Sequence, residues 1–225
     1  MQPERVPPIV SPKTGEFWYR FDDPKGKPIG FGRLVMTRPP KGGLSVTWEN
    51  KQICEGGTYE EDRTLVLDSR WRMLSASHSE DGKILAEGRR EGSRWIGVSK
   101  DRTNPEGPGE KVDIPLTEDA ASAMQFVLLA GIPLESGVSI PRTEHNDFNA
   151  YRQPYPVTLR CLGPETLQGE GRDLPTFHMA LERGQNILNL WVNAQREIVK
   201  IDWGEIGMMV LSLSPTRHLF RPGGP

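Results

Sequence analysis

The chain is short of cysteine, and this excludes one class of small scaffold. Its 225 residues contain two cysteines, Cys54 and Cys161, and no Cys-x-x-Cys pair. Two cysteines cannot form the disulfide framework of a small secreted domain. The side chains are either free thiols buried in the core, which we favour, or the two halves of one disulfide formed in an oxidising compartment.

The chain also lacks an excess of charge of either sign. Its 28 Lys and Arg residues are balanced by 30 Asp and Glu residues, which gives a net charge of −2. Such a balance provides no general attraction to nucleic acid or to an anionic membrane surface. We therefore expect no nucleic-acid partner.

Long apolar runs are missing as well. No stretch approaches the roughly 18 apolar residues of a membrane-spanning helix, so no transmembrane segment is predicted. The first fifteen residues lack the apolar centre of a signal peptide. We therefore expect either a cytoplasmic protein or a periplasmic or envelope-associated protein whose leader has been removed.

Catalytic and cofactor motifs are absent too. The sequence contains no G-x-S-x-G nucleophile turn, no glycine-rich phosphate loop and no pair of histidines at zinc-binding spacing. The carboxylate run "YEED" at 59–62 lacks the ligand spacing of a calcium loop, and we interpret it as hairpin surface. The sequence thus predicts no cofactor and no metal site.

What the sequence does contain is a long series of strand patterns. In "GLSVTWENKQIC", Leu44, Val46 and Trp48 alternate with polar residues, which is the two-residue period of a half-buried strand. About a dozen such runs are separated by glycine, proline and charged clusters. Sequential antiparallel strands with short connections predict a meander, and a large twisted sheet tends to curl into a half-open β-barrel.

One stretch, "PLTEDAASAMQFVLLAG", predicts a helix over residues 117–130. Thr117 is a suitable N-terminal cap, and Gly131 can adopt the left-handed conformation that ends a helix. The helix is apolar on nearly all sides, and such a helix is buried. We expect it to pack on the concave face of the curved sheet.

These patterns predict a single folded domain with two appendages. Residues 1–15 contain four prolines and predict an extended N-terminal tether. Residues 16–214 form the β-rich half-barrel domain. Residues 215–225 are expected to be a flexible C-terminal tail.

The second half of the chain resembles a known family. A "D-x-x-SA" start of the helix, an "L-x-x-G" after it, a "G-x-E-x-L … G-E-G" segment and an "LWVN … REIVKID" hairpin resemble the DUF3108-type envelope proteins of the lipoprotein-carrier superfamily. The resemblance is best over residues 110–213. The matching positions are Asp119, Ser122, Ala123, Leu134, Gly137, 163–167, 169–177 and 190–200.

The resemblance implies a half-open barrel wrapped on a helix, with an apolar cavity able to hold acyl chains. A violacein-pathway enzyme of similar fold implies that such a cavity can also host chemistry. The carriers cover their sheet with several helices, whereas this sequence predicts one.

Two sets of candidate site residues follow. The candidate ligand cavity is lined by apolar residues of the helix and by tryptophans of the strands: Met124, Phe126, Leu128, Trp48, Trp191 and Trp203. If the protein is an enzyme, the polar loop that contains Glu144, His145 and Asp147 is the first place to look, because a histidine beside carboxylates can act as a general base.

Three functions remain open from the sequence. The first, which we favour, is a non-catalytic cell-envelope protein that binds a lipid or another hydrophobic ligand in the half-barrel. The second is an enzyme that uses the same cavity. The third is a structural or assembly factor whose sheet edge pairs with a strand of a protein partner, which the sequence does not identify.

Overall fold

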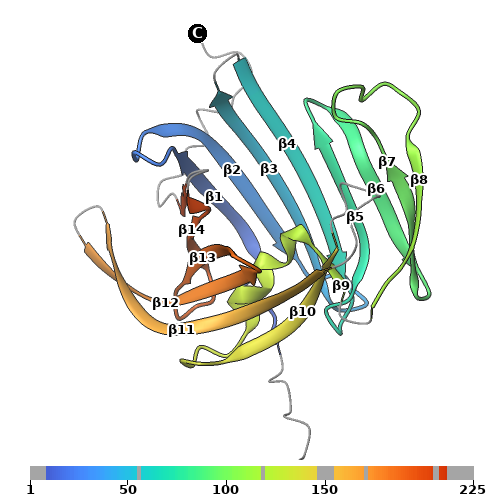
Figure 1. Cartoon of the computed structure of the whole chain (residues 1–225). Helices are drawn as coiled ribbons and strands as arrows, with labels where there is room; N and C mark the ends of the chain where they lie inside the picture. The colour runs from blue at the N-terminus through green and yellow to red at the C-terminus, as the bar shows by residue number, and fades with distance from the viewer. Residues whose placement is uncertain are drawn as a thin grey trace, which may run out of the picture.

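The protein is built on one large curved sheet. The computed structural model describes residues 9–54, 57–117, 120–145, 155–169, 172–204 and 208–211. Within these residues, fifteen strands form a continuous sheet with the order β8-β7-β6-β5-β4-β3-β2-β1-β15-β14-β13-β12-β11-β10-β9. The sheet curves into a half-open barrel and its edge strands, β8 and β9, do not pair with each other (Figure 1).

The first eight strands form a meander in chain order: β1 (Gly15–Asp22), β2 (Pro28–Thr37), β3 (Leu44–Cys54), β4 (Gly57–Leu67), β5 (Met73–Glu80), β6 (Lys83–Glu91), β7 (Arg94–Ser99) and β8 (Glu110–Pro115). The remaining elements are β9 (Ala120–Ser122), the helix η1 (Ala123–Gly131), β10 (Ser139–His145), β11 (Tyr155–Gly169), β12 (Arg172–Arg183), β13 (Asn186–Val192), β14 (Ile198–Asp202) and β15 (Met208–Leu211). The last described strand, β15, pairs antiparallel with β1 and so joins the two meanders. Among the strand pairs of the described residues, β9 and β10 alone are parallel.

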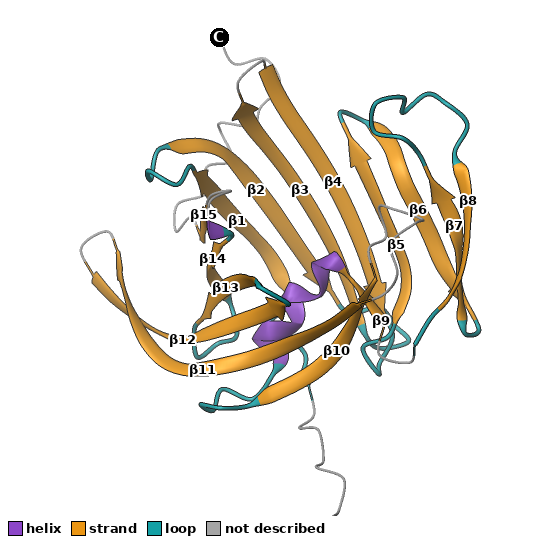
Figure 2. Cartoon of the chain, in the orientation of Figure 1, coloured by secondary structure: helices purple, strands orange, loops and turns teal. Residues whose placement is uncertain are grey.

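The core lies on the concave side of this sheet. Leu44, Val46 and Trp48 of β3 are buried there, whereas the residues between them face outward and are partly exposed. The same alternation continues along β1, β2 and β4 because successive side chains of a strand point to opposite faces. The sequence prediction of a mainly β half-barrel, with one helix on its concave face, is confirmed (Figure 2).

The helix begins later than predicted. A helix was expected over 117–130, but residues 120–122 form strand β9, and η1 is a 3-10 helix over 123–131. The backbone of Ala120 pairs with Thr143 and that of Ser122 with His145. Pairing with β10 satisfies backbone groups that the first turn of a helix would leave without partners, so the sheet replaces the expected capped start. The burial of the helix is confirmed, since residues 126–130 are all buried.

The end of η1 is held by distant parts of the chain. The Arg196 guanidinium donates hydrogen bonds from Nη1 to the carbonyl oxygens of Ala130 and Ile132, both at 2.9 Å. The backbone N–H of Val10 donates to the carbonyl of Gly131 at 2.8 Å. A side chain at Gly131 would place its Cβ 2.2 Å from the Val10 carbonyl oxygen. The glycine is therefore required by this close approach and not by the left-handed conformation that the sequence suggested.

Part of the predicted tether contacts the domain. Strand β1 starts at Gly15, and Ile9 packs against the core. Residues 1–8 and the predicted tail, 215–225, lie outside the described residues. No helix among the described residues is both long and apolar enough to span a membrane.

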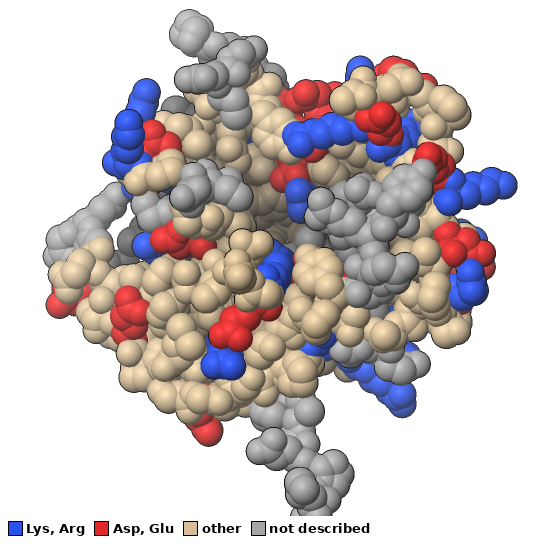
Figure 3. Space-filling view, viewed as in Figure 1, with Lys and Arg blue, Asp and Glu red and all other residues tan. Residues whose placement is uncertain are grey.

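The charges on the surface are mixed. On the face seen in Figure 3, acidic and basic side chains of the described residues lie in small mixed groups, and no large area carries a single sign. This distribution agrees with the near-balance of charges in the sequence.

The cysteines do not form a disulfide. Cys161 is a free thiol, fully buried in β11, and burial raises its pKa. Its neutral thiol packs in the core like a small apolar side chain, as favoured from the sequence. Cys54 ends β3, and its side chain lies outside the described part of the structure.

Candidate functional site

The concave face changes from apolar to polar along strands β3, β4 and β5. Asn50 follows Trp48 on the same face of β3, and Glu61 precedes Leu65 on the same face of β4. The register places Asn50 opposite Glu61 and Glu61 opposite Glu80 of β5. We call Asn50, Glu61, Arg63, His78 and Glu80 the polar cluster.

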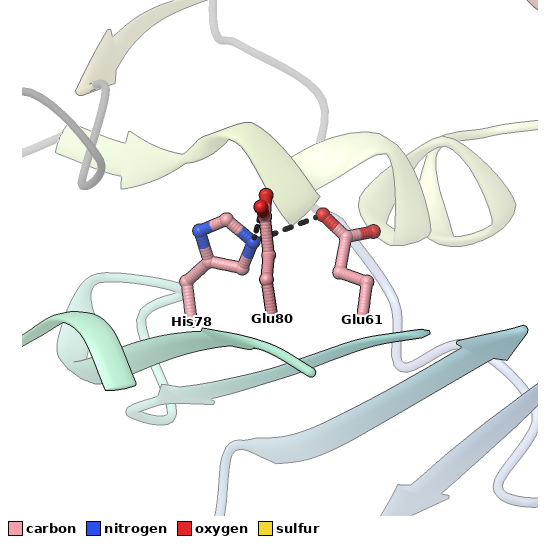
Figure 4. A group of neighbouring side chains, drawn as sticks. All are labelled: Glu61, His78 and Glu80. Atoms are coloured by element: carbon pink, nitrogen blue, oxygen red, sulfur yellow. Dashed lines mark ion pairs between the residues drawn. The ribbon is translucent and has the colours of Figure 1, made fainter. Parts of the chain in front are cut away.

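Three members of the polar cluster converge on one point. His78 Nε2 lies 3.0 Å from Glu61 Oε1 and 3.3 Å from Glu80 Oε1 (Figure 4). His78 and Glu61 are each 6% exposed, and the Glu80 side chain is 12% exposed. An imidazole and two carboxylates are thus held together in a nearly water-free environment.

The carboxylates are held by further donors. Glu61 accepts a hydrogen bond from Arg63 Nε at 2.8 Å and one from Asn50 Nδ2 at 3.0 Å. Burial raises the pKa of Glu61, but the hydrogen bond to His78 and the charge and hydrogen bonds of Arg63 outweigh it and bring the pKa to about 2. Glu61 is therefore an ionised carboxylate at neutral pH.

Glu80 is held from the other side. Its Oε1 accepts a hydrogen bond from the Tyr59 hydroxyl at 3.0 Å, and its Oε2 accepts one from Arg102 Nε at 2.7 Å. Burial, followed by the charges of Glu61 and Glu80, raises the pKa of Tyr59, so its hydroxyl remains a donor. The two arginines offset the charges of the two carboxylates.

No sequence motif predicts this cluster, although the alternation along β4 contains a signal for it. The prediction that residues 59–62 are hairpin surface is wrong for Glu61. Glu60 and Asp62 do face outward, but Glu61 shares the inner face with Leu65 because it lies four residues away in an alternating strand. No local motif marks His78, because one of its two carboxylate partners, Glu61, lies on the neighbouring strand β4.

The structure brings five of the six predicted cavity residues to the inner side of the sheet. Met124, Phe126 and Leu128 of η1 are buried in the core, as is Trp48. Trp203 is partly buried against the same core. The three helix residues are therefore packed between η1 and the sheet, where they contribute to folding.

Trp191 is on the opposite face, which corrects the prediction for this residue. Its ring stacks on His178 at a centroid distance of 4.7 Å, and Lys200 Nζ lies 4.5 Å from the ring centroid. The neighbouring residues Leu190 and Val192 point into the core. Trp191 is thus separated from the other five residues by the sheet itself.

Glu144 and His145, the two candidate catalytic residues that the structure describes, do not face each other. Glu144 is 2% exposed and accepts hydrogen bonds from Arg183 Nε at 2.8 Å and from the Tyr155 hydroxyl. His145 is the last residue of β10 and not part of a loop, and it is 1% exposed. Adjacent residues of a strand point to opposite faces, so Glu144 cannot orient the His145 ring. Asp147 lies outside the described residues.

The environment of His145 makes it a poor base for an external substrate. Burial lowers its pKa, so the imidazole is neutral at neutral pH. Its Nε2 has no hydrogen-bond partner among the described residues. A neutral, enclosed imidazole to which no carboxylate of the described residues is bonded favours a packing role.

An aromatic group lies on the inner side of β1 and β3 and at the end of β14. The ring centroids of Phe21 and Trp48 lie 5.8 Å apart in an edge-to-face arrangement, and Trp203 stacks on Phe21 at 6.3 Å. A Cβ at Gly32 would lie 2.9 Å from both Phe21 and Trp48, so the glycine allows these rings to lie on the strand. We call Phe21, Trp48 and Trp203 the aromatic group. The polar cluster begins next to it, at Asn50.

Two clefts lie on the outer face of the sheet. One, of about 510 Å³, is lined by residues of β4–β7 that include Thr64, Ser77 and Arg89. The other, of about 320 Å³, lies over β1–β4 and is lined by Trp18, Arg33 and other, mostly charged, side chains. Both clefts mix polar and apolar lining and lie opposite the core, so neither is the apolar cavity predicted from the sequence.

Comparisons with known proteins identify the fold and no activity. No family model matches the chain, and no curated protein matches it. A β-barrel-like protein of the domain of unknown function DUF1849 from Brucella abortus has 11% sequence identity and a TM-score of 0.52, over 91% of this chain and 97% of that protein. A protein with a YmcC-like fold from Bacteroides fragilis covers the same shares at 10% identity, with a TM-score of 0.26. The first similarity shows that this chain has a β-barrel-like fold.

Proposed function

We propose that the protein is a non-catalytic binding protein of the cell envelope that holds a lipid or another hydrophobic ligand against the inner face of its half-barrel. The observation that carries the proposal is the aromatic group. Trp203 is only partly buried, and it extends the apolar core to the surface through Phe21 and Trp48. Aromatic side chains that continue from a core to solvent offer a large apolar contact area to a ligand.

The arrangement of η1 supports this proposal. The helix lies against β9, β10, β11 and β12, which form one arm of the curved sheet. The aromatic group lies on β1–β3 and the β14 end, away from those four strands. One short helix thus packs against one part of the concave face, and the partly buried Trp203 is the exposed end of the aromatic group.

The resemblance to DUF3108-type proteins of the lipoprotein-carrier superfamily supports the same function and an envelope location. Each buried methylene contributes about 0.8 kcal/mol, so an acyl chain of about ten methylenes could supply roughly 8 kcal/mol before the costs of association. Dissociation constants in the micromolar range are therefore expected.

Titration of a fluorescent acyl probe tests the proposal. Binding of the probe to the wild-type protein should be saturable. Bound probe should quench the tryptophan emission of the protein. Trp203→Ala should weaken binding about tenfold, because it removes the partly exposed ring of the aromatic group. Trp18→Ala is a matched control, since Trp18 lies on the outer face, where its indole N–H donates to Glu16. Non-saturable binding to wild type, or equal losses in both variants, would contradict the proposal.

A further inference from the structure

The polar cluster has the dimensions of a metal-binding site. His78 Nε2, a Glu61 carboxylate oxygen and a Glu80 carboxylate oxygen all lie within 4.8 Å of one another. The two shorter separations, from Nε2 to each carboxylate, are 3.0 and 3.3 Å. Around a zinc ion with bonds of about 2.0–2.1 Å, neighbouring ligand atoms are about 3.3 Å apart. The three donors thus need only small movements to bind one ion between them.

A second, independent feature points to the same place. Asn50 is 9% exposed, and its Nδ2 donates to Glu61 Oε2, so its carboxamide lies beside the Glu61 carboxylate. Its Oδ1 is buried and has no hydrogen-bond partner in the described part of the chain. Folding a carbonyl oxygen into such a position is unfavourable unless something accepts its lone pairs. A cation bound at the cluster would do so.

We propose that Glu61, His78 and Glu80 bind one divalent transition-metal ion of the zinc class, with the Asn50 carbonyl oxygen as a fourth ligand. The imidazole favours zinc, iron or nickel over calcium and magnesium, which prefer oxygen ligands alone. This site is distinct from the aromatic group, and it does not depend on the proposed hydrophobic ligand.

The arginines around the cluster set the conditions for binding. Arg63 and Arg102 pair with the same carboxylates that the ion would use, so they compete with it. The Arg102 side chain is 68% exposed and can move into solvent, whereas Arg63 is 26% exposed and lies along the inner face. Removal of the Arg102 charge should therefore strengthen metal binding without disturbing the core.

The test is calorimetric titration of the full chain, stripped with a chelator, with Zn²⁺ alone. Wild type should bind one ion per chain saturably. Glu80→Gln removes a direct ligand and should weaken binding by at least about 10-fold to 100-fold, the range found when only a hydrogen-bond partner of a ligand is lost. Arg102→Gln should tighten binding several-fold. His178→Gln is the matched control, because His178 forms a comparable pair with Glu165 on the outer face, 3.1 Å apart.

A spectroscopic readout distinguishes coordination from unspecific binding. Co²⁺ in place of Zn²⁺ should give visible absorption bands that His78→Gln removes and His178→Gln retains. If His78→Gln does not fold, the Zn²⁺ affinities of Glu80→Gln and Arg102→Gln test the proposal instead. The first should be lower than that of wild type and the second higher. An absence of saturable Zn²⁺ binding to wild type would overturn the proposal. Equal affinities of wild type, Glu80→Gln and Arg102→Gln would overturn it too.

Discussion

A single residue can connect a turn to distant parts of this chain. Trp71, between β4 and β5, has a φ of 63°, in the left-handed region that a bulky residue rarely adopts. Its backbone N–H donates to the Asp68 carbonyl at 2.9 Å, and its own carbonyl accepts from Arg142 Nη2 at 2.8 Å. Its indole N–H donates to the Ile9 carbonyl at 2.9 Å. The unfavourable conformation is thus held by three separate bonds.

Asp68 provides a pH-dependent contribution to this turn. Burial raises its pKa, but hydrogen bonds from the backbone and side chain of Arg72 and from the backbone of Arg70 outweigh this, so the pKa lies below the ordinary 3.8. The folded state therefore favours the ionised form, and the stabilisation is full above the unfolded pKa and is lost as the pH falls through the folded pKa.

Asp68→Asn should accordingly reduce the free energy of unfolding at about pH 7 by up to about 1 kcal/mol, the range of a partly exposed ion pair. The difference from wild type should shrink as the pH falls below about 4. Urea unfolding at a series of pH values measures it. A difference that is the same at about pH 7 and at about pH 2 would show that the ionised carboxylate is not responsible.

At the scale of elements, η1 depends on packing more than on its own helix-forming tendency. It is nine residues long, and its described side chains are buried on all sides, with Leu128 0% exposed. Short 3-10 helices have weaker hydrogen-bond geometry than α-helices. The sheet around η1 must therefore provide most of its stability.

Leu128→Asp should prevent stable folding, because an unpaired carboxylate in this position costs several kcal/mol, comparable to the stability of a whole domain. Leu128→Met is the control and should cost less than about 1.5 kcal/mol, since it conserves volume. Thermal unfolding followed by circular dichroism compares the two. Equal melting temperatures for Leu128→Asp and wild type would mean that η1 does not pack in the core.

At the scale of the whole molecule, contacts between distant segments close the structure around η1. The N-terminal Ile9 and Val10 bridge the β4–β5 turn and the end of η1 through the Trp71 and Gly131 bonds. The β1–β15 pairing joins the first meander to the second in the same way. Both connections link parts of the chain that are far apart in sequence.

Deletion of residues 1–12 should therefore lower the melting temperature by about 5 °C. Two lost hydrogen bonds of about 1 kcal/mol each, at about 2–4 °C per kcal/mol, account for this magnitude. Deletion of residues 1–8 is the matched control and should have a smaller effect, since it leaves Ile9 and Val10 in place. An unchanged melting temperature in both deletions would mean that the whole segment behaves as a free tether.

The sequence by itself determined the strands, the burial of the helix and the faces of most strand residues. Alternation with a period of two is a local property, and it identifies Leu44, Val46 and Trp48 as inward-facing without knowledge of their partners. The same alternation places Trp191 on the outer face, opposite Leu188, Leu190 and Val192. Its aromatic side chain had favoured the cavity instead.

Only the tertiary structure decided which residues meet. The register between β4 and β5 brings Glu61, His78 and Glu80 together, and no short motif encodes a cluster drawn from two strands. The late start of η1 depends on a free edge of β10, with which residues 120–122 pair. Backbone pairing and side-chain clusters depend on contacts between distant segments, whereas periodicity depends on neighbours alone, which is why the sequence predicted the half-barrel but not the polar cluster.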